Sequence, residues 1–502
     1  MRISKNRKWW VLGSLSFALV AVGLDLTVLN VALPTLAREL HASTSDLQWF
    51  ADAYNLVLAA ALLPAGMLGD RFGRKKMILM ALILFGAASL GCASADSSEM
   101  LIGMRAVLGL GAAFLIPLSM SVLPVLFSEE ERTRAMMIWA TANMINIPLG
   151  PIVGGWLLEH YHWSSIFLLN IPFVVIAVFA VLLLMPESRS AYSPRLDWLG
   201  VVTSSLGLVG VTYGVIRAGE KGWSNTEALL LLIAGVIVLA GFVLWQRKTK
   251  HPLIDLSLFR TAGFTWGSAL ATLVSFALFG LLFALPLYFQ EIGGADALGT
   301  GMRLLPLIGG LIIGAQASDK LSPRIGKKAI VAAGFIFLAA GLGLGGMTDV
   351  QSGYGFAAFW ITVTGMGTGL ALPMAMDAAL GELSAERSGI GSALIMALRQ
   401  VGGSIGVAIL GTTLNSIYRH QIAGADFPDA VVNAAKQSVS AGVAIADRLQ
   451  SPELLHTVHR AFVHGMHVML WECAAVAVLG FILALFFLPN KKALENGKRK
   501  VG

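Results

Sequence analysis

The stretch WWVLGSLSFALVAVGLDLTVLNVA, from Trp9 to Ala32, decides the class of fold, because it is apolar over a length that crosses a membrane. A helix of about twenty apolar residues spans a hydrocarbon core of roughly 30 Å. One carboxylate, Asp25, lies inside this stretch, where insertion scales put the cost of a charge at roughly 2.5–3.5 kcal/mol. A charge at such a depth predicts a functional group, so one segment supplies both the fold class and the first candidate residue.

Windows of the same kind recur along nearly the whole chain. Of its 502 residues, 56% are hydrophobic and only 13% are charged, against about 25% charged in ordinary soluble domains. The predicted spans are 8–31, 47–68, 77–95, 100–124, 136–158, 164–185, 197–216, 227–246, 262–290, 298–318, 328–347, 354–378, 392–416 and 461–488. These windows predict an all-α integral membrane protein with fourteen transmembrane helices.

The distribution of positive charges agrees with fourteen spans and a cytoplasmic N-terminus. Short cytoplasmic loops collect Lys and Arg, and 26 of the 36 such residues fall in segments that this numbering places inside. Both termini of this multi-pass protein are therefore predicted to be cytoplasmic. The net charge of +7 is explained by this orientation and by contact with anionic lipid. Nucleic acid is not expected as a partner, because no soluble basic domain is present.

An internal repeat divides the spans into two halves. GMLGDRFGRKK, at 66–76, follows the second span, and DKLSPRIGKK, at 319–328, follows the tenth. Internal repeats are typical of transporter folds. The alignment places Arg324 on Arg71, Gly326 on Gly73 and Lys327 on Arg74, while Pro323 replaces Asp70. We therefore predict a six-helix half at 1–190, two inserted helices at 191–258, and a second six-helix half at 259–502 with an outer loop around 418–460.

The first copy of this loop has the residues of a polar latch on the cytoplasmic side. Two glycines let the second helix approach a neighbour closely, a third permits a tight turn, and the aspartate can cap a helix or pair with arginine. The predicted latch residues are Gly66, Gly69, Asp70, Arg71, Gly73 and Arg74. The alternative is a basic loop that only fixes the orientation of the helices.

Several motifs, in the right order, carry a resemblance to a known family. GMLGDRFGRKK resembles the loop signature of the major facilitator superfamily, and LDLTVLNVALP (24–34) resembles the first-helix motif of its fourteen-helix drug:proton antiporter branch. WFADAYNLVLA (49–59) is similar to the second helix of exporters of quaternary ammonium compounds. Further resembling stretches are MLIGMRAVLGLGAA (100–113), NIPLGPIVGGWL (146–157), HPLIDLSLFR (251–260) and RQVGGSIGVAILGT (399–412).

The resemblance implies what the protein does and where. It implies proton-coupled efflux of drugs or antiseptics, often lipophilic cations, across a bacterial cytoplasmic membrane, with the proton gradient in place of a cofactor. The implied partners are small-molecule drugs, protons and membrane lipid, and we expect a functional monomer. The alternatives are a dedicated exporter of one antibiotic or metabolite, and a membrane receptor or scaffold that transports nothing.

Asp25 and Arg105 are the predicted proton-coupling residues. Burial disfavours the charged carboxylate, whereas a nearby guanidinium favours it, and Arg105, in the middle of the fourth span, is the candidate partner. The resemblance assigns this arginine and the first-helix acid to proton coupling. The alternative is a static buried ion pair that fixes the packing of the helices.

Asp52, Trp49 and Tyr54 are the predicted substrate-binding residues. A carboxylate beside aromatic rings suits a lipophilic cation, because the rings offer faces for cation–π contact and the acid offers charge. If a proton and a drug compete for one acid, antiport follows by linkage. The alternative is that Asp52 lies at the interface and is wetted by outside water.

The fifth span has the composition of a close helix crossing. Small residues permit the approach, and prolines bend the backbone, so this segment can act as a rocking surface. Its predicted residues are Gly150, Pro151, Gly154 and Gly155. In the resembling family this motif distinguishes antiporters from importers.

Signatures of ATP-driven and zinc-dependent proteins are absent from the sequence. It holds no G-x-x-x-x-G-K-[ST] phosphate loop and no H-E-x-x-H zinc site, and neither an enzyme nor a metal site is predicted. The stretch IMALRQ (395–400) lacks the acid that some resembling exporters carry, which argues against a preference for divalent cations. Arg399 opens the thirteenth span near the cytoplasm, where snorkelling to the interface is the simpler explanation.

Overall fold

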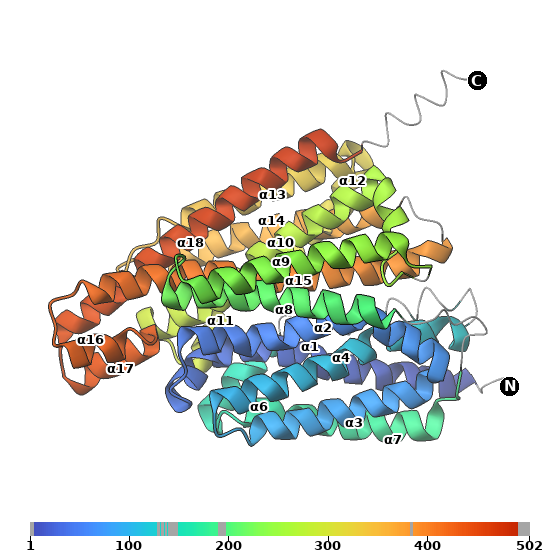
Figure 1. The fold of residues 1–502 in the computed structure, drawn as a ribbon, viewed down its shortest axis with the longest axis horizontal. Coiled ribbons are helices and arrows are strands. Elements are labelled where there is room, and N and C mark those ends of the chain that lie inside the picture. The colour runs from blue at the N-terminus through green and yellow to red at the C-terminus, as the bar shows by residue number, and fades with distance from the viewer. Residues whose placement is uncertain are drawn as a thin grey trace. The chain divides into compact units, whose positions relative to one another are not determined.

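The computed structural model describes residues 5–127, 131, 135, 138, 149–188, 197–250, 252–381 and 385–489. Over these ranges the secondary structure is helical, without a strand (Figure 1). The first half contains α1 (Lys5–Glu39), α2 (Thr44–Phe72), α3 (Arg74–Ala93), α4 (Ser98–Leu126), a helix over 149–160, α6 (Ser165–Leu168) and α7 (Asn170–Leu184). The inserted helices are α8 (Trp198–Lys221) and α9 (Thr226–Lys248).

The second half is equally helical. It contains η1 (Leu256–Arg260), α10 (Ala262–Leu287), η2 (Tyr288–Ile292), α11 (Ala297–Arg303), α12 (Leu305–Ile325), α13 (Lys327–Gly345), α14 (Tyr354–Leu380), α15 (Ala385–Ala423), α16 (Asp429–Ala435), α17 (Val439–Arg448) and α18 (Pro452–Phe487). The outer loop predicted around 418–460 therefore holds two short helices, α16 and α17.

Twelve helices of the described residues are long and apolar enough to cross a membrane. Two predicted spans are not among them. The span at 47–68 corresponds to the 29-residue α2, which carries three aspartates and an arginine, and the span at 136–158 lies partly outside the described residues. The number fourteen therefore stays a prediction.

Contacts between Cα atoms divide the chain into two compact units. Unit 1 is 1–214, 225–254 and 295–302, and unit 2 is 215–224, 255–294 and 303–502. Unit 1 thus holds α1 to α7, most of the inserted pair and most of α11. The predicted boundaries at 190 and 258 stay predictions.

Unit 1 is packed through glycines that bring helix backbones together. A Cβ placed on Gly109 of α4 would lie 2.4 Å from the carbonyl oxygen of Tyr54 on α2. One placed on Gly111 would lie 3.1 Å from backbone atoms of Phe85 on α3. Because real Cβ atoms essentially never come within 3.0 Å of backbone, α4 is fixed closely against α2.

The two copies of the repeated loop form the same turn. Gly73 separates α2 from α3 with a φ of 111°, and Gly326 separates α12 from α13 with a φ of 87°. Residues with a Cβ are strained at such φ values, whereas glycine is not. The alignment of Gly326 with Gly73 is therefore matched by the backbone geometry.

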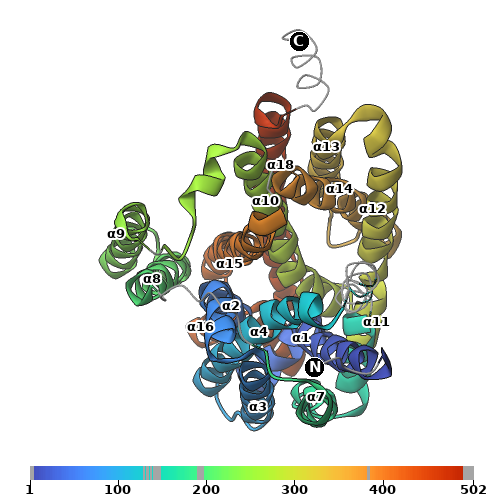
Figure 2. The ribbon, with the colours of Figure 1, turned by 90° about the vertical axis from the view of Figure 1, so that its right-hand side faces the viewer.

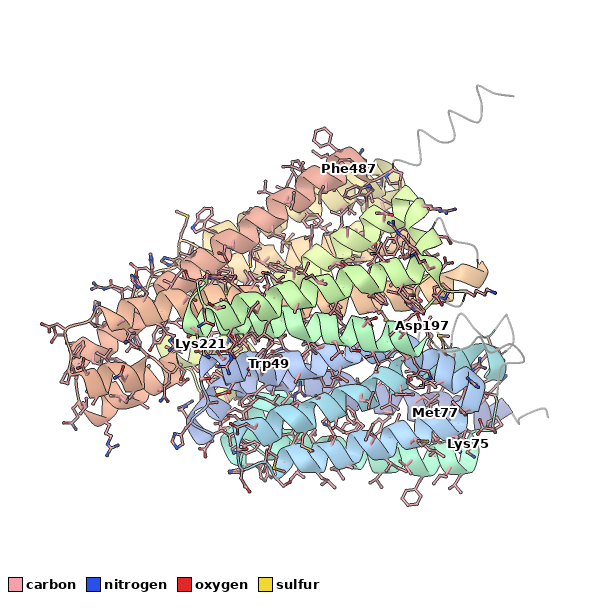
Figure 3. The ribbon with its side chains drawn as sticks, in the orientation of Figure 1. Trp49, Lys75, Met77, Asp197, Lys221 and Phe487 are labelled. Atoms are coloured by element: carbon pink, nitrogen blue, oxygen red, sulfur yellow. The ribbon has the colours of Figure 1, made fainter. Side chains whose placement is uncertain are left out.

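The inserted helices α8 and α9 lie side by side (Figure 2). A Cβ on Gly214 of α8 would lie 2.7 Å from the backbone nitrogen of Leu232 on α9, so the two helices are in backbone contact. Asp197, at the start of α8 (Figure 3), accepts hydrogen bonds from the Trp245 indole at 2.9 Å and the Gln246 amide at 2.6 Å. This buried carboxylate fastens the end of α9 to the beginning of α8.

Candidate functional site

The centre of unit 1 contains a buried ion pair. Asp25 on α1 is 3% exposed and Arg105 on α4 is 1% exposed. Nη1 of Arg105 donates to Oδ2 of Asp25, and Nε donates to the carbonyl oxygen of Phe50 on α2 at 2.9 Å. The structure thus brings together the two residues predicted to pair. It holds the guanidinium by a second contact that does not depend on the carboxylate.

Asn170 completes the surroundings of Asp25. This fully buried side chain, at the start of α7, donates to Oδ1 of Asp25 at 3.2 Å and to Oγ of Ser89 on α3 at 3.1 Å. Each oxygen of the carboxylate therefore has its own donor, one charged and one neutral. The sequence analysis missed Asn170, and its one available signal was an amide inside the apolar run from 164 to 185.

Tyr54 also belongs to this cluster. The ring centroid lies 4.6 Å from Cζ of Arg105, and the side chain is fully buried. Its hydroxyl has no hydrogen-bond partner among the described residues. The ring therefore stacks on the cation of the protein itself, although its predicted role was to contact a cationic substrate.

Asp52 is fully buried, and lies on a different face of α2 from Tyr54. Residues two positions apart on a helix do not face each other, whereas Trp49 and Asp52, three apart, share a face. The ring of Trp49 packs 5.8 Å from that of Tyr213 on α8. The three residues predicted to bind substrate thus separate into a pair, Trp49 and Asp52, and a tyrosine that contacts Arg105.

The loop between α2 and α3 is fastened to the segment that follows α7. Oε1 of Glu187 accepts a hydrogen bond from the backbone nitrogen of Lys75 at 3.1 Å, and a Cβ on Gly73 would lie 2.7 Å from the same oxygen. Nζ of Lys75 donates to the carbonyl of Leu182 at 2.8 Å. Figure 3 shows Lys75 and Trp49 toward opposite ends of unit 1.

The other predicted latch residues have local contacts. A Cβ on Gly69 would meet Leu118 of α4, that on Gly66 would reach only Pro117, at 3.9 Å, and Arg71 lies 5.5 Å from the ring of Phe72. The backbone nitrogen of Arg74 donates to the carbonyl of Ser188 at 2.9 Å. The side chain of Asp70 lies outside the described part of the chain. A latch between the two halves stays a prediction.

The helix over 149–160 crosses two neighbours at close range. A Cβ on Gly150 would lie 1.8 Å from Oγ1 of Thr27, and one on Gly154 would lie 2.7 Å from Val28, so this face meets α1. A Cβ on Gly155 would lie 2.6 Å from the carbonyl oxygen of Ala297 on α11. The carbonyl oxygen of Pro151 approaches the same helix, 2.2 Å from a Cβ placed on Gly301. All four predicted residues therefore lie at close helix contacts, while their role in rocking stays a prediction.

Comparison with known proteins identifies the family. The family described as Major Facilitator Superfamily matches residues 15–407. The chain belongs to the major facilitator superfamily. It is 30% identical, over 98% of its own length and 94% of the relative's, to the tetracenomycin C resistance and export protein of Streptomyces glaucescens. It is also 30% identical, over 96% and 95% of the two chains, to the multidrug efflux pump LfrA of Mycolicibacterium smegmatis.

Solved structures show the same fold. A bacterial homolog of the human lysosomal transporter Spinster, in an inward-facing and unoccupied conformation, matches with a TM-score of 0.69 at 16% identity. The match covers 97% of this chain and 98% of the other. This member of the superfamily is therefore an all-α, multi-pass membrane protein, as its composition predicted. The family and these relatives are transporters.

In unit 2, α15 carries an arginine whose head group contacts a neighbouring membrane-spanning helix. Arg399 lies fourteen residues after the first residue of α15, and its Nε donates to Oγ of Ser275 at 3.1 Å. Ser275 is at the middle of α10. Arg399 was expected to open its helix and to snorkel to the interface, but the structure instead holds its head group against the middle of a neighbouring helix.

Proposed function

We propose that this transporter exports lipophilic drugs or antiseptics in exchange for protons. The chain matches two relatives over nearly their full lengths, and these relatives are named as an export protein and an efflux pump. The observation that carries proton coupling is the Asp25–Arg105 pair, because it places an acid with its own cation inside the membrane. Intramembrane ionisable residues are costly, and they mark proton relays and substrate pathways.

The geometry around Asp25 gives a proton a means of changing the helix packing. When the carboxylate takes a proton, it loses its charge. Arg105 then keeps a full charge whose remaining contacts among the described residues are the Phe50 carbonyl and the ring of Tyr54. An uncompensated buried charge is strongly unfavourable. Protonation therefore disfavours the present arrangement of α1 against α4. A proton that binds one conformation more tightly than the other shifts the equilibrium between them by the difference in binding free energy.

Asp52 and Trp49 are the proposed contacts of a cationic substrate. They share one face of α2, and the carboxylate is buried where it cannot be fully hydrated. A lipophilic cation suits a carboxylate that is held away from water, and an indole ring adds a cation–π contact. Tyr54 is better assigned to the proton-coupling cluster, because its ring lies over Arg105.

Transport by the purified chain in liposomes tests these assignments. The native chain is compared with Asp25→Asn and Asp52→Asn, using one monovalent and one divalent lipophilic cation under an imposed pH gradient. We expect Asp25→Asn to abolish the response to pH, and Asp52→Asn to abolish the selection among cations while drug-dependent proton flux persists. Equal activity of all three chains would remove both assignments.

A dedicated exporter of one compound is the second candidate, because the relative from Streptomyces glaucescens is named for a single antibiotic. Competition distinguishes the two. In a multidrug pump, structurally unrelated cations inhibit one another's transport, whereas a dedicated exporter ignores all but close analogues.

A further inference from the structure

Arg399 is a charged group of unit 2 that the proposed function does not use. The guanidinium has five N–H groups and is always charged. Nε donates to Oγ of Ser275 at 3.1 Å, and Nη1 lies 3.6 Å from Sδ of Met376 on α14. Both partners are neutral. Three N–H groups remain, two of them on Nη2, and none has a partner among the described residues.

No carboxylate in the described part of the chain compensates this charge. The acid next to Met376 in sequence is Asp377, and it is paired with Lys327. Arg105 of unit 1, in contrast, has a carboxylate partner. A hydroxyl and a thioether do not offset the cost of a guanidinium in a low-dielectric interior.

The packing of α15 on α10 fixes the backbone that carries Arg399. A Cβ on Gly406 would lie 2.3 Å from the carbonyl oxygen of Phe276, and one on Gly402 would lie 2.9 Å from that of Thr272. These contacts fix the helix one and two turns beyond Arg399. The side chain of Arg399 is half-buried.

We propose that Arg399 and Ser275 form a subsite for the carboxylate or phenolate of an amphipathic substrate. Two parallel N–H donors of a guanidinium match the two oxygens of a carboxylate, and such charge-assisted pairs are the strongest hydrogen bonds that proteins make. A bound oxyanion supplies the charge that the protein does not. This inference rests on the proposed export function, and it extends the substrate class from cations to acids and zwitterions.

Two dyes that differ in one charge test the proposal. Rhodamine B carries a free carboxylate, and its ethyl ester is the same cation without it. Binding of each to the full-length chain is measured by fluorescence anisotropy in nanodiscs of zwitterionic lipid. We expect Arg399→Gln to weaken binding of the acid by about tenfold or more, the effect of losing a charge-assisted hydrogen bond, and to leave binding of the ester unchanged.

The control variants separate charge from packing. Arg419→Gln makes the same substitution near the other end of α15 and should change neither dye. Arg399→Lys keeps the charge but loses the fork of donors, so it should retain part of the preference for the acid. Equal weakening of both dyes by Arg399→Gln, or no change in either, would overturn the subsite.

A measurement on the native chain keeps the test decisive if Arg399→Gln does not fold. Benzoate should displace the acid dye but not the ester, and benzamide should displace neither. Failure of benzoate to compete overturns the proposal. If adding phosphatidylglycerol abolishes the preference for the acid, the oxyanion is a lipid phosphate, and the substrate assignment is wrong. Proton-driven transport of the ester reports the export function separately.

Discussion

The carboxylate of Asp25 is bonded by donors of two kinds, and their loss should have different consequences. Arg105 contributes charge to one oxygen, whereas Asn170 contributes a neutral amide to the other. Both donors satisfy a buried acceptor, which would be costly to leave without a hydrogen bond. Only Arg105, however, is left as an uncompensated charge when the acid is neutralised.

Asn170→Ala should lower the stability of the protein. It removes the neutral donor from Oδ1 of Asp25 and leaves that buried oxygen without its hydrogen bond. The expected loss is roughly 1.5–3 kcal/mol, the contribution of a hydrogen bond to a charged group. Thermal unfolding of the purified chain in detergent measures the loss.

Ser89→Ala is the matched control for this prediction. It removes the second acceptor of Asn170 but leaves the bond to Asp25 in place. We therefore expect a smaller loss of stability in the same assay. Native stability of Asn170→Ala would mean that the hydrogen bond to Asp25 contributes nothing.

The ion pair should also show coupling in stability. Asp25→Asn leaves Arg105 buried without a carboxylate, and a single break of this kind costs about 3–5 kcal/mol. The double variant Asp25→Asn, Arg105→Gln should cost less than the sum of the two single changes, by about 1–3 kcal/mol. Thermal unfolding in detergent measures this difference. Additive losses would show that the two side chains do not stabilise each other.

Sequence reasoning identified the charged members of this site but not the neutral ones. A charge in an apolar segment stands out at any register, so Asp25 and Arg105 could be found without knowing which helix faces meet. Asn170 and Ser89 could not, because an amide or a hydroxyl in a membrane helix often bonds within its own helix. The face shared by Trp49 and Asp52, and not by Tyr54, follows from helical spacing and could have been read in advance.

At the scale of helices, the backbone contact between the helix over 149–160 and α11 sets the next prediction. Gly155→Ala places a methyl group 2.6 Å from the carbonyl oxygen of Ala297, where no flexible side chain can yield. We expect the variant to lose most of its transport while substrate binding changes little, because the clash acts on the helix crossing and not on Asp52. Efflux rates and dye binding separate the two effects.

Gly241→Ala is the control for this prediction. Nothing lies within 4 Å of a Cβ at that position on α9, and alanine is the better helix former by roughly 0.5–1 kcal/mol. Native transport in this variant, together with loss in Gly155→Ala, would assign the effect to the crossing. Native transport in both would remove the proposed rocking surface.

Helix positions were predicted well by hydropathy, and helix ends were not. The thirteenth span, predicted at 392–416, is the core of α15, which runs from Ala385 to Ala423. The fourteenth, predicted at 461–488, begins nine residues earlier, at Pro452. Hydropathy detects only the part of a helix that matches lipid, whereas the backbone stays helical through polar residues at either end. The turn at Gly326 could be predicted from the sequence, because aligning the two repeats places Gly326 on Gly73.

At the scale of the whole transporter, the driving force limits the number of protons. A pH gradient supplies about 1.4 kcal/mol per pH unit for each proton, and the membrane potential supplies roughly 2.3 kcal/mol per charge per 100 mV. Exchange of one proton for one monovalent cation moves no net charge, so the potential does not contribute. A stoichiometry above one makes the exchange electrogenic and adds the potential to the force.

We therefore predict more than one proton per monovalent cationic drug. Liposomes containing the native chain are held at zero pH difference, and a potassium gradient with valinomycin imposes a potential. Drug efflux driven by the potential alone is the expected outcome. The driving force for this efflux should roughly double when the potential is doubled, because the electrical energy is linear in voltage. Asp25→Asn should abolish it, since no proton then enters through the pair. A native chain that moves no drug under the potential, yet responds to a pH gradient, exchanges one charge for one.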